Sequence, residues 1–457
     1  MKQHSNALTE GPIARSLIAF TIPILLGNVL QSLNGSVNAI WVGRFLGEAA
    51  LSATAIANSV LFLLLGGVFG ISMAATILIA QYVGAQNMEA ARRVVGASGT
   101  FFALIATVIA SAGFIWVTPL LVAMHAPIQA IPLARDYLRI LFIAIPFLYI
   151  YTYVMAVLRG AGDSKTPLKF LVLSVGLDIV LNPLLIFGAG PIPKLGIAGS
   201  ALATLIANAV SLGALLTYLY RSRHPLCLRG NELSYLKFDT AIVATLLKKG
   251  LPMGLHLVLI SANAVAVISL VNRFGTDTTA AYGAVWQLWN YLQMPAFAIG
   301  AAVSSMAAQN VGAQRWDRVS RIAHTGLLSH LVLTGTLVLI LLLLNRQALS
   351  LFLAPGAALS IADHINQTSA WSFIFYGIAM VLYGVVRSTG AVIVPVVALA
   401  ISLWGVRLPC AALLMPLYEA DAIWWSFPIS ALVSATLAVT YYYFGNWRSA
   451  HMLPATN

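Results

Sequence analysis

Long apolar runs separated by short polar segments cover the whole chain. Each run has roughly 20 residues, the length that a helix needs to cross the ~30 Å hydrocarbon core of a bilayer. Gly and Pro interrupt several runs, and the period-2 alternation of a transmembrane β-strand is missing. The pattern predicts an all-α integral membrane protein with twelve transmembrane helices. The expected spans are residues 17–43, 52–79, 94–117, 136–158, 168–188, 196–220, 250–272, 280–306, 320–344, 366–386, 392–415 and 422–444.

One motif occurs twice at a fixed interval. Residues 80–86 read Ala-Gln-Tyr-Val-Gly-Ala-Gln and residues 308–314 read Ala-Gln-Asn-Val-Gly-Ala-Gln, an offset of 228 (309 − 81). Arg159, Gly162 and Pro167 recur at the same offset. The chain therefore consists of two homologous halves. Because each half holds an even number of spans, the halves are parallel repeats, a plan typical of transporters that bind substrate where the repeats meet.

Composition supports a membrane protein, with 60% hydrophobic residues, 8% charged residues and a mean hydropathy of +0.90. The net charge of +12 does not indicate nucleic acid as a partner, because the Lys and Arg residues gather in segments expected in the cytoplasm. This charge pattern places both termini in the cytoplasm, and we expect a bacterial inner membrane location. The domains expected are an N-terminal six-helix lobe (1–220), a basic cytoplasmic linker (221–249) and a C-terminal six-helix lobe (250–457).

Asp178 is the acidic residue expected deep within a span. A carboxylate at a helix centre costs roughly 2.5 to 3.5 kcal/mol on insertion, so such residues usually serve a function, although a structural hydrogen bond is the alternative. Asp178 can hold a proton or a buried cation, and these two occupants exclude each other. That exclusion is the minimum chemistry of a proton/cation antiporter. Asn182 lies one turn further, before Pro183, which either frees backbone carbonyls for a polar cavity or only kinks the helix.

Gln31, Asn34 and Asn38 form a polar stripe in the first span, at spacings of three and four residues. Such a stripe either lines a cavity or joins helices through side-chain hydrogen bonds. Asn38 and Asp178 both fall on valines of the second half, at offsets of 229 and 228 respectively. We therefore expect the coupling site in the N-terminal lobe.

Aromatic and Met side chains in two further spans are suited to flat organic cations, through stacking and cation-π attraction. Packing against neighbouring helices is the alternative for these residues. Arg407 is the basic residue expected within a span; a structural pairing is favoured over contact with an anionic substrate. The candidate cavity-lining residues are Tyr149, Tyr153 and Met155 in the fourth span and Gln287, Asn290 and Tyr291 in the eighth.

Enzyme signatures are missing from the sequence. It contains no Walker phosphate loop, no His-Glu-x-x-His, no Gly-x-Ser-x-Gly and no metal-ligand spacing of Cys or His. We therefore expect neither catalysis nor a cofactor or metal, and transport driven by an ion gradient.

Several segments together resemble the multidrug and toxic compound extrusion (MATE) family over nearly the whole chain. These segments are Pro23, Val42-Gly43-Arg44 with Gly47, Gln81-x-Val83-Gly84-Ala85, Arg159-Gly160-x-Gly162-Asp163-x-x-x-Pro167, Asn182-Pro183-x-x-Ile186-Phe187-Gly188 and Gly196-Ile197-x-Gly199-Ser200-Ala201. The resemblance implies two six-helix lobes around a central cleft and alternating access. It also implies a monomer that exports small organic cations, including xenobiotics, against inward flow of H+ or Na+.

The prokaryotic DinF branch is the most similar, because its coupling residues lie in the N-terminal lobe. That branch usually has Asp where this chain has Asn38, and the acid and amide at Asp178 and Asn182 are exchanged. The Glu that the NorM branch carries in its second lobe is replaced near Ile260. A single protonatable Asp178 favours H+ over Na+ as the coupling ion.

The hypothesis is an H+-coupled multidrug exporter in which Asp178 is the protonation switch. The first span would bend at Pro23, Gly27 and Gly35 when Asp178 takes up a proton. The alternatives are a Na+-coupled antiporter, a lipid-linked oligosaccharide flippase, which needs basic residues in the cleft, and an ion channel or membrane enzyme.

Overall fold

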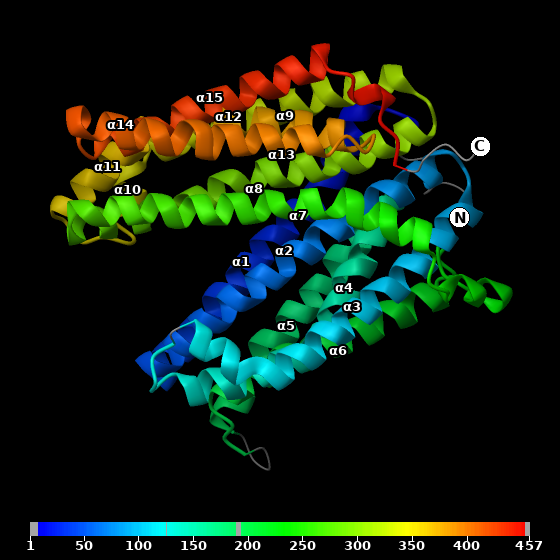
Figure 1. Cartoon of the computed structure of the whole chain (residues 1–457), viewed down its shortest axis with the longest axis horizontal. Coiled ribbons are helices and arrows are strands. Elements are labelled where there is room, and N and C mark those ends of the chain that lie inside the picture. The colour runs from blue at the N-terminus through cyan, green and yellow to red at the C-terminus, as the bar shows by residue number, and fades with distance from the viewer. Residues whose placement is uncertain (1–7, 125, 189–192, 453–457) are drawn as a thin grey trace. The chain divides into compact units, whose positions relative to one another are not determined.

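The computed structural model describes residues 8–124, 126–188 and 193–452, and within that part the chain is helical, with no strand. Figure 1 shows the long helices along the chain. The first half holds α1 (Ile13–Leu46), α2 (Glu48–Gly84), α3 (Met88–Ala123), α4 (Ile131–Gly160), α5 (Lys165–Phe187), α6 (Ile197–Arg221) and the short η1 (Gly230–Leu236). The second half holds α7 (Thr240–Val271), η2 (Asn272–Phe274), α8 (Thr276–Gly312), α9 (Trp316–Leu343), α10 (Asn345–Leu349), α11 (Ala357–Ser369), α12 (Ser372–Arg387), α13 (Ile393–Ala400), the π-helical η3 (Ile401–Arg407), α14 (Leu408–Tyr418), α15 (Asp421–Phe444) and η4 (Trp447–Ser449).

The helices match the expected spans. Ten in the described residues are long and apolar enough to cross a membrane, counting α13, η3 and α14 as one. An eleventh forms if α11 and α12, which meet at a bend of 46°, are taken together. The remaining expected span is α8, which has 37 residues but is more polar. The prediction of an all-α multi-pass membrane protein is confirmed.

Both halves use the same packing scheme. In the first half α4 packs against α2, α3 and α6, and α5 pairs with α6. In the second half α12 packs against α8, α9 and α15, and α14 pairs with α15. The repeated helices thus make equivalent contacts, as expected for duplicated halves.

The duplicated motif also ends in the same turn twice. Gln86 and Gln314 both adopt a left-handed backbone with φ of 57°. In each turn the next residue donates a backbone hydrogen bond five residues back, from Asn87 to Tyr82 (2.9 Å) and from Arg315 to Asn310 (2.8 Å). The offset of 228 found in the sequence is therefore also present in the backbone.

The chain divides into two compact units, and the division differs from the expected domains at the N-terminus. One unit, here called the N-lobe, is Leu26–Gly250, which includes the expected linker and the start of α7. The other, the C-lobe, combines residues 251–452 with residues 8–25. The reason is packing, since Leu17 and Phe20 are buried in a C-lobe cluster.

Hydrogen bonds hold the N-terminal segment in the C-lobe as well. Asn310 Nδ2 donates to the carbonyl of Leu8 (2.9 Å), and Arg315 Nη1 donates to the carbonyl of Thr9 (2.6 Å). The helix α1 therefore starts in the C-lobe and continues in the N-lobe. It is one continuous helix through Pro23, Gly27 and Gly35, so bending at these positions stays a prediction.

The helices α5 and α6 approach each other closely at Gly199. A Cβ added there would overlap the backbone of Leu185 and lie 2.9 Å from the nitrogen of Ile186. A residue without a Cβ is therefore required at this crossing. The close approach brings Thr204, about one turn further along α6, against Asp178 of α5.

We predict that Gly199→Ala destabilises the protein, because the added methyl group must push α6 away from the α5 backbone. Overpacking of this kind typically costs about 1 to 3 kcal/mol. Gly213→Ala is the matched control on α6, since no atom lies within 4 Å of a Cβ there. Thermal unfolding of both variants in detergent checks the prediction, and equal stability of the two would contradict it.

Candidate functional site

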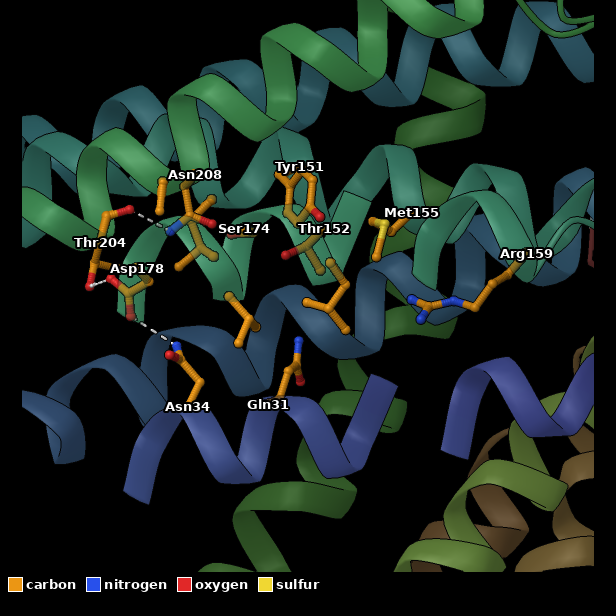
Figure 2. Close-up of a pocket in the computed structure, with 14 residues that line it drawn as sticks. Gln31, Asn34, Tyr151, Thr152, Met155, Arg159, Ser174, Asp178, Thr204 and Asn208 are labelled. Atoms are coloured by element: carbon orange, nitrogen blue, oxygen red, sulfur yellow. Dashed lines mark hydrogen bonds between the residues drawn. The ribbon is translucent and has the colours of Figure 1, made fainter. Parts of the chain in front are cut away.

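A cavity of about 250 Å³ lies within the N-lobe among α1, α4, α5 and α6 (Figure 2). Its wall combines an acid, a guanidinium, amides and hydroxyls with apolar side chains. The lining residues are Gln31, Asn34, Leu148, Tyr151, Thr152, Met155, Arg159, Leu171, Ser174, Val175, Asp178, Thr204, Ala207 and Asn208.

Asp178 is buried in this wall, with 3% of its surface exposed. Asn34 Nδ2 of α1 donates to its Oδ2 (2.9 Å), and Thr204 Oγ1 of α6 donates to its Oδ1 (3.0 Å), as Figure 2 shows. Both donors are neutral. The carboxyl group is thus satisfied by hydrogen bonds from two neighbouring helices, while its charge has no counterion among the ion pairs of the described residues.

Thr204 has two acceptors within reach. Besides Asp178 Oδ1, its hydroxyl lies 3.4 Å from the backbone carbonyl of Ser200. A hydroxyl can accept one hydrogen bond while it donates another. Thr204 can therefore donate to a charged Asp178, or accept from a protonated Asp178 and donate to Ser200 instead.

Arg159 lines the other end of the cavity from Asp178 (Figure 2). The ion pairs of the described residues do not include it. Its positive charge repels a cation, so a cationic guest would be held at the Asp178 end. In the sequence this arginine directly follows the expected span 136–158, a position that did not indicate a role in a cavity.

The amides near Asp178 have different roles from those expected. Asn182 is fully buried and donates to the backbone carbonyl of Asp178 (2.9 Å), and its Oδ1 has no partner among the described residues. Asn38 accepts from Ser200 Oγ (2.8 Å) and does not line the cavity. Of the expected stripe on α1, Gln31 and Asn34 do line it.

The cavity is lined by a different face of α4 from the one that contains Tyr149 and Tyr153. Met155 lines the cavity as expected, but Tyr149 and Tyr153 do not. Tyr149 donates to the carbonyl of Leu64 (3.1 Å), and Tyr153 donates to the carbonyl of Val95 (2.9 Å). These two rings therefore pack against α2 and α3.

The cavity-lining residues of α4 were partly recoverable from the sequence. Leu148, Tyr151, Thr152, Met155 and Arg159 are spaced by three, one, three and four residues, which is one helical face. Starting from Met155, this periodicity selects Tyr151 rather than Tyr153. Ser174, Thr204 and Asn208 carried no such signal, because small polar residues are common in spans.

The residues expected on α8 lie away from the N-lobe cavity and from a second, smaller cavity within the C-lobe. Asn290 accepts from Gln293 Nε2 (2.9 Å), Tyr291 is 43% exposed and Gln287 lines neither cavity. The neighbouring face of α8, with Trp286 and Trp289, lines the second cavity of about 70 Å³.

Arg407 also lines the second cavity. Its Nε donates to Ser430 Oγ (2.9 Å) and its Nη1 to Asn263 Oδ1 (3.3 Å), and the guanidinium lies over the Phe427 ring at 4.3 Å. The favoured structural pairing is thus present, with neutral groups. As for metals, the described residues contain no group of three His, Cys, Asp or Glu that could hold an ion.

We predict different effects for two nearby tyrosines of α4. Tyr153→Phe removes a buried hydroxyl that bonds Val95 and Ser98, and should lower the free energy of unfolding by about 1 kcal/mol or more. Tyr151→Phe removes a buried hydroxyl that has no partner among the described residues, and should leave stability unchanged. Unfolding in detergent measures both, and a destabilised Tyr151→Phe would mean that α4 is rotated.

Comparison with known proteins gives a consistent result. The MatE family profile matches residues 23–184 and 252–413. "Probable multidrug resistance protein YoeA" of Bacillus subtilis is 39% identical over 368 residues, covering 80% of each chain. "Probable multidrug resistance protein YpnP" of the same organism is 31% identical over 377 residues, covering 82% of this chain and 83% of that protein.

Solved structures match the fold. A crystal structure of MATE in the straight conformation has a TM-score of 0.89 and 20% identity, covering 96% of this chain and 97% of that chain. At that identity the likeness concerns the fold alone. The two profile segments are separated by the same offset at both ends, 229 residues (252 − 23 and 413 − 184).

Proposed function

Because the chain belongs to the MatE family of multidrug efflux transporters, we propose that it is an H+-coupled antiporter that exports small organic cations, with Asp178 as the protonation switch. The observation that carries the proposal is the buried Asp178 carboxyl group, which lines a cavity and is held by two neutral donors. The chain would work as a monomer in the bacterial inner membrane, with both termini in the cytoplasm.

The charged form of Asp178 would bind the exported cation. A carboxylate has about four lone-pair positions, and Asn34 and Thr204 occupy two of them. The same cavity also offers Met155 and the Tyr151 ring, surfaces suited to an apolar cation. Arg159 at the other end would keep the positive group of the substrate close to Asp178.

Uptake of a proton would release the cation. A proton on Oδ1 of Asp178 would be donated to the Thr204 oxygen, and the Thr204 hydroxyl would turn to the Ser200 carbonyl. Asn34 would continue to donate to Oδ2. Each hydrogen bond that is lost is thus replaced, so both protonation states are satisfied while only one attracts a cation.

The coupling ion H+ is favoured over Na+ by the same geometry. Na+ prefers several oxygen ligands, as hard cations do in general. At Asp178 one of the two contacting side-chain groups is the nitrogen of Asn34. The Oδ1 of Asn182, one turn from Asp178 on α5 and without a partner among the described residues, is an oxygen that would support Na+, which makes Na+ coupling the second candidate.

The first experiment follows ethidium flux in liposomes under an imposed pH gradient, with and without Na+. Wild-type protein should transport in response to the pH gradient, and Asp178→Asn should lose this flux because an amide has no charge to exchange. Asp277→Asn, at the start of α8, is the control and should transport normally. Wild-type flux in Asp178→Asn would refute the switch, and flux that follows only the Na+ gradient would establish Na+ coupling.

A further prediction concerns the Thr204 hydroxyl, which would donate to Asp178 in one protonation state and to the Ser200 carbonyl in the other. Thr204→Val removes it, and proton-driven flux should fall about fivefold or more, since one bond to the carboxyl group is lost in each protonation state. Thr204→Ser keeps a hydroxyl and should retain most of the flux. Equal loss in the two variants would mean that the shape of Thr204, and not its hydroxyl, is required.

A further inference from the structure

The second cavity, within the C-lobe, has the opposite charge to Asp178. Its lining includes the guanidinium of Arg407 and no acidic residue. Arg407 takes part in no ion pair among the described residues. A charge in the low dielectric of a transmembrane bundle is costly without a partner of opposite charge. The cavity is therefore suited to an anion.

Arg407 is held in place and keeps donors free. Two of the five N–H donors of the guanidinium are used, by Ser430 and by Asn263. The guanidinium of Arg407 also lies over the Phe427 ring, with 4.3 Å between its Cζ and the ring centroid. The orientation is thus fixed by neutral groups, and the remaining N–H groups are available for the paired oxygens of a carboxylate.

The pair Asn263 and Arg407 is the repeat counterpart of Asn34 and Asp178. Both pairs are related by an offset of 229 (263 − 34 and 407 − 178), the offset of the family segments. In the N-lobe the amide donates to the acid, and in the C-lobe the guanidinium donates to the amide oxygen. The same helix contact thus carries a negative group in one repeat and a positive group in the other.

The π-helix η3 explains why Arg407 is related to Asp178 by 229, and not by the offset of 228 that placed a valine opposite Asp178. Pro167 and Pro395, which precede it, are still related by 228. A π-turn bonds residue i to residue i+5 and so holds an additional residue compared with an α-turn. The insertion shifts the register by one and aligns Arg407 with Asp178. Such turns are frequent at functional sites.

A second buried donor without a partner lines the same cavity. Tyr282 is 3% exposed, and its hydroxyl has no hydrogen-bond partner among the described residues. A buried hydroxyl left unbonded is unfavourable by about 1 to 3 kcal/mol. The rings of Trp286, Trp289 and Phe373 belong to the apolar part of the wall. The cavity thus combines two donors for oxygen with aromatic surfaces.

We propose that this cavity binds a small aliphatic carboxylate, with Arg407 and Tyr282 donating to its oxygens and its apolar end against the aromatic rings. A volume of about 70 Å³ fits an acetate-sized anion and is too small for a carboxylate with an aromatic ring. One guanidinium matches a single negative charge better than a phosphate dianion. The site does not depend on Asp178 or on the proposed antiport mechanism.

The test is binding of fluoroacetate to the full chain in nanodiscs of zwitterionic lipid, followed by fluorine NMR. The neutral fluoroacetamide has nearly the same shape and should not compete. Arg407→Gln should abolish binding, and Tyr282→Phe should weaken it about tenfold, as expected for a hydrogen bond to a charged group. Arg346→Gln, a largely exposed cation of the same lobe, and Asp178→Asn should bind like wild type.

Two results would overturn the proposal. The first is equal binding of the acid and the amide, and the second is unchanged affinity in Tyr282→Phe. If Arg407→Gln fails to fold, Tyr282→Phe decides alone, because its hydroxyl has no bond in the described structure to lose. Loss of ethidium flux in Asp178→Asn together with normal fluoroacetate binding would separate the two proposals.

Discussion

The structure depends on how a single carboxyl group is held inside a helical bundle. Asp178 is buried among helices where charge is unfavourable, and it is satisfied by an amide of α1 and a hydroxyl of α6. Because these donors belong to different helices, the acid joins three helices of the N-lobe at one point. The tight crossing at Gly199 serves the same contact, since it fixes the distance of α6 from α5.

Duplication gave the two lobes the same helix packing, and small local changes gave them different chemistry. The turns at Gln86 and Gln314 and the packing around α4 and α12 stayed equivalent. One inserted residue near the middle of the eleventh span forms a π-turn. This turn aligns Arg407 with Asp178 of the fifth span. The site chemistry of a repeat can thus be reversed without changing its fold.

Most of the fold could be predicted from the sequence, because hydrophobic runs and a repeated motif are strong signals. The twelve spans, the duplication and the isolated intramembrane acid were all available there. The site was harder, because a span that is hydrophobic all round does not show which face meets a cavity. Tyr153 and Tyr151 differ by two positions and have opposite surroundings. The offset of 228 misplaced the counterpart of Asp178, since a π-turn has no sequence signature.

The stretch of α1 within the N-lobe allows no change of length between its two cavity amides. Gln31 lines the cavity, and Asn34, three residues further along the same helix face, donates to Asp178. An α-helix turns by about 100° per residue, since it has 3.6 residues per turn. Inserting or deleting one residue between Gln31 and Asn34 would therefore rotate one of the two amides away from the cavity. The number of residues in this stretch is as much a part of the site as the side chains.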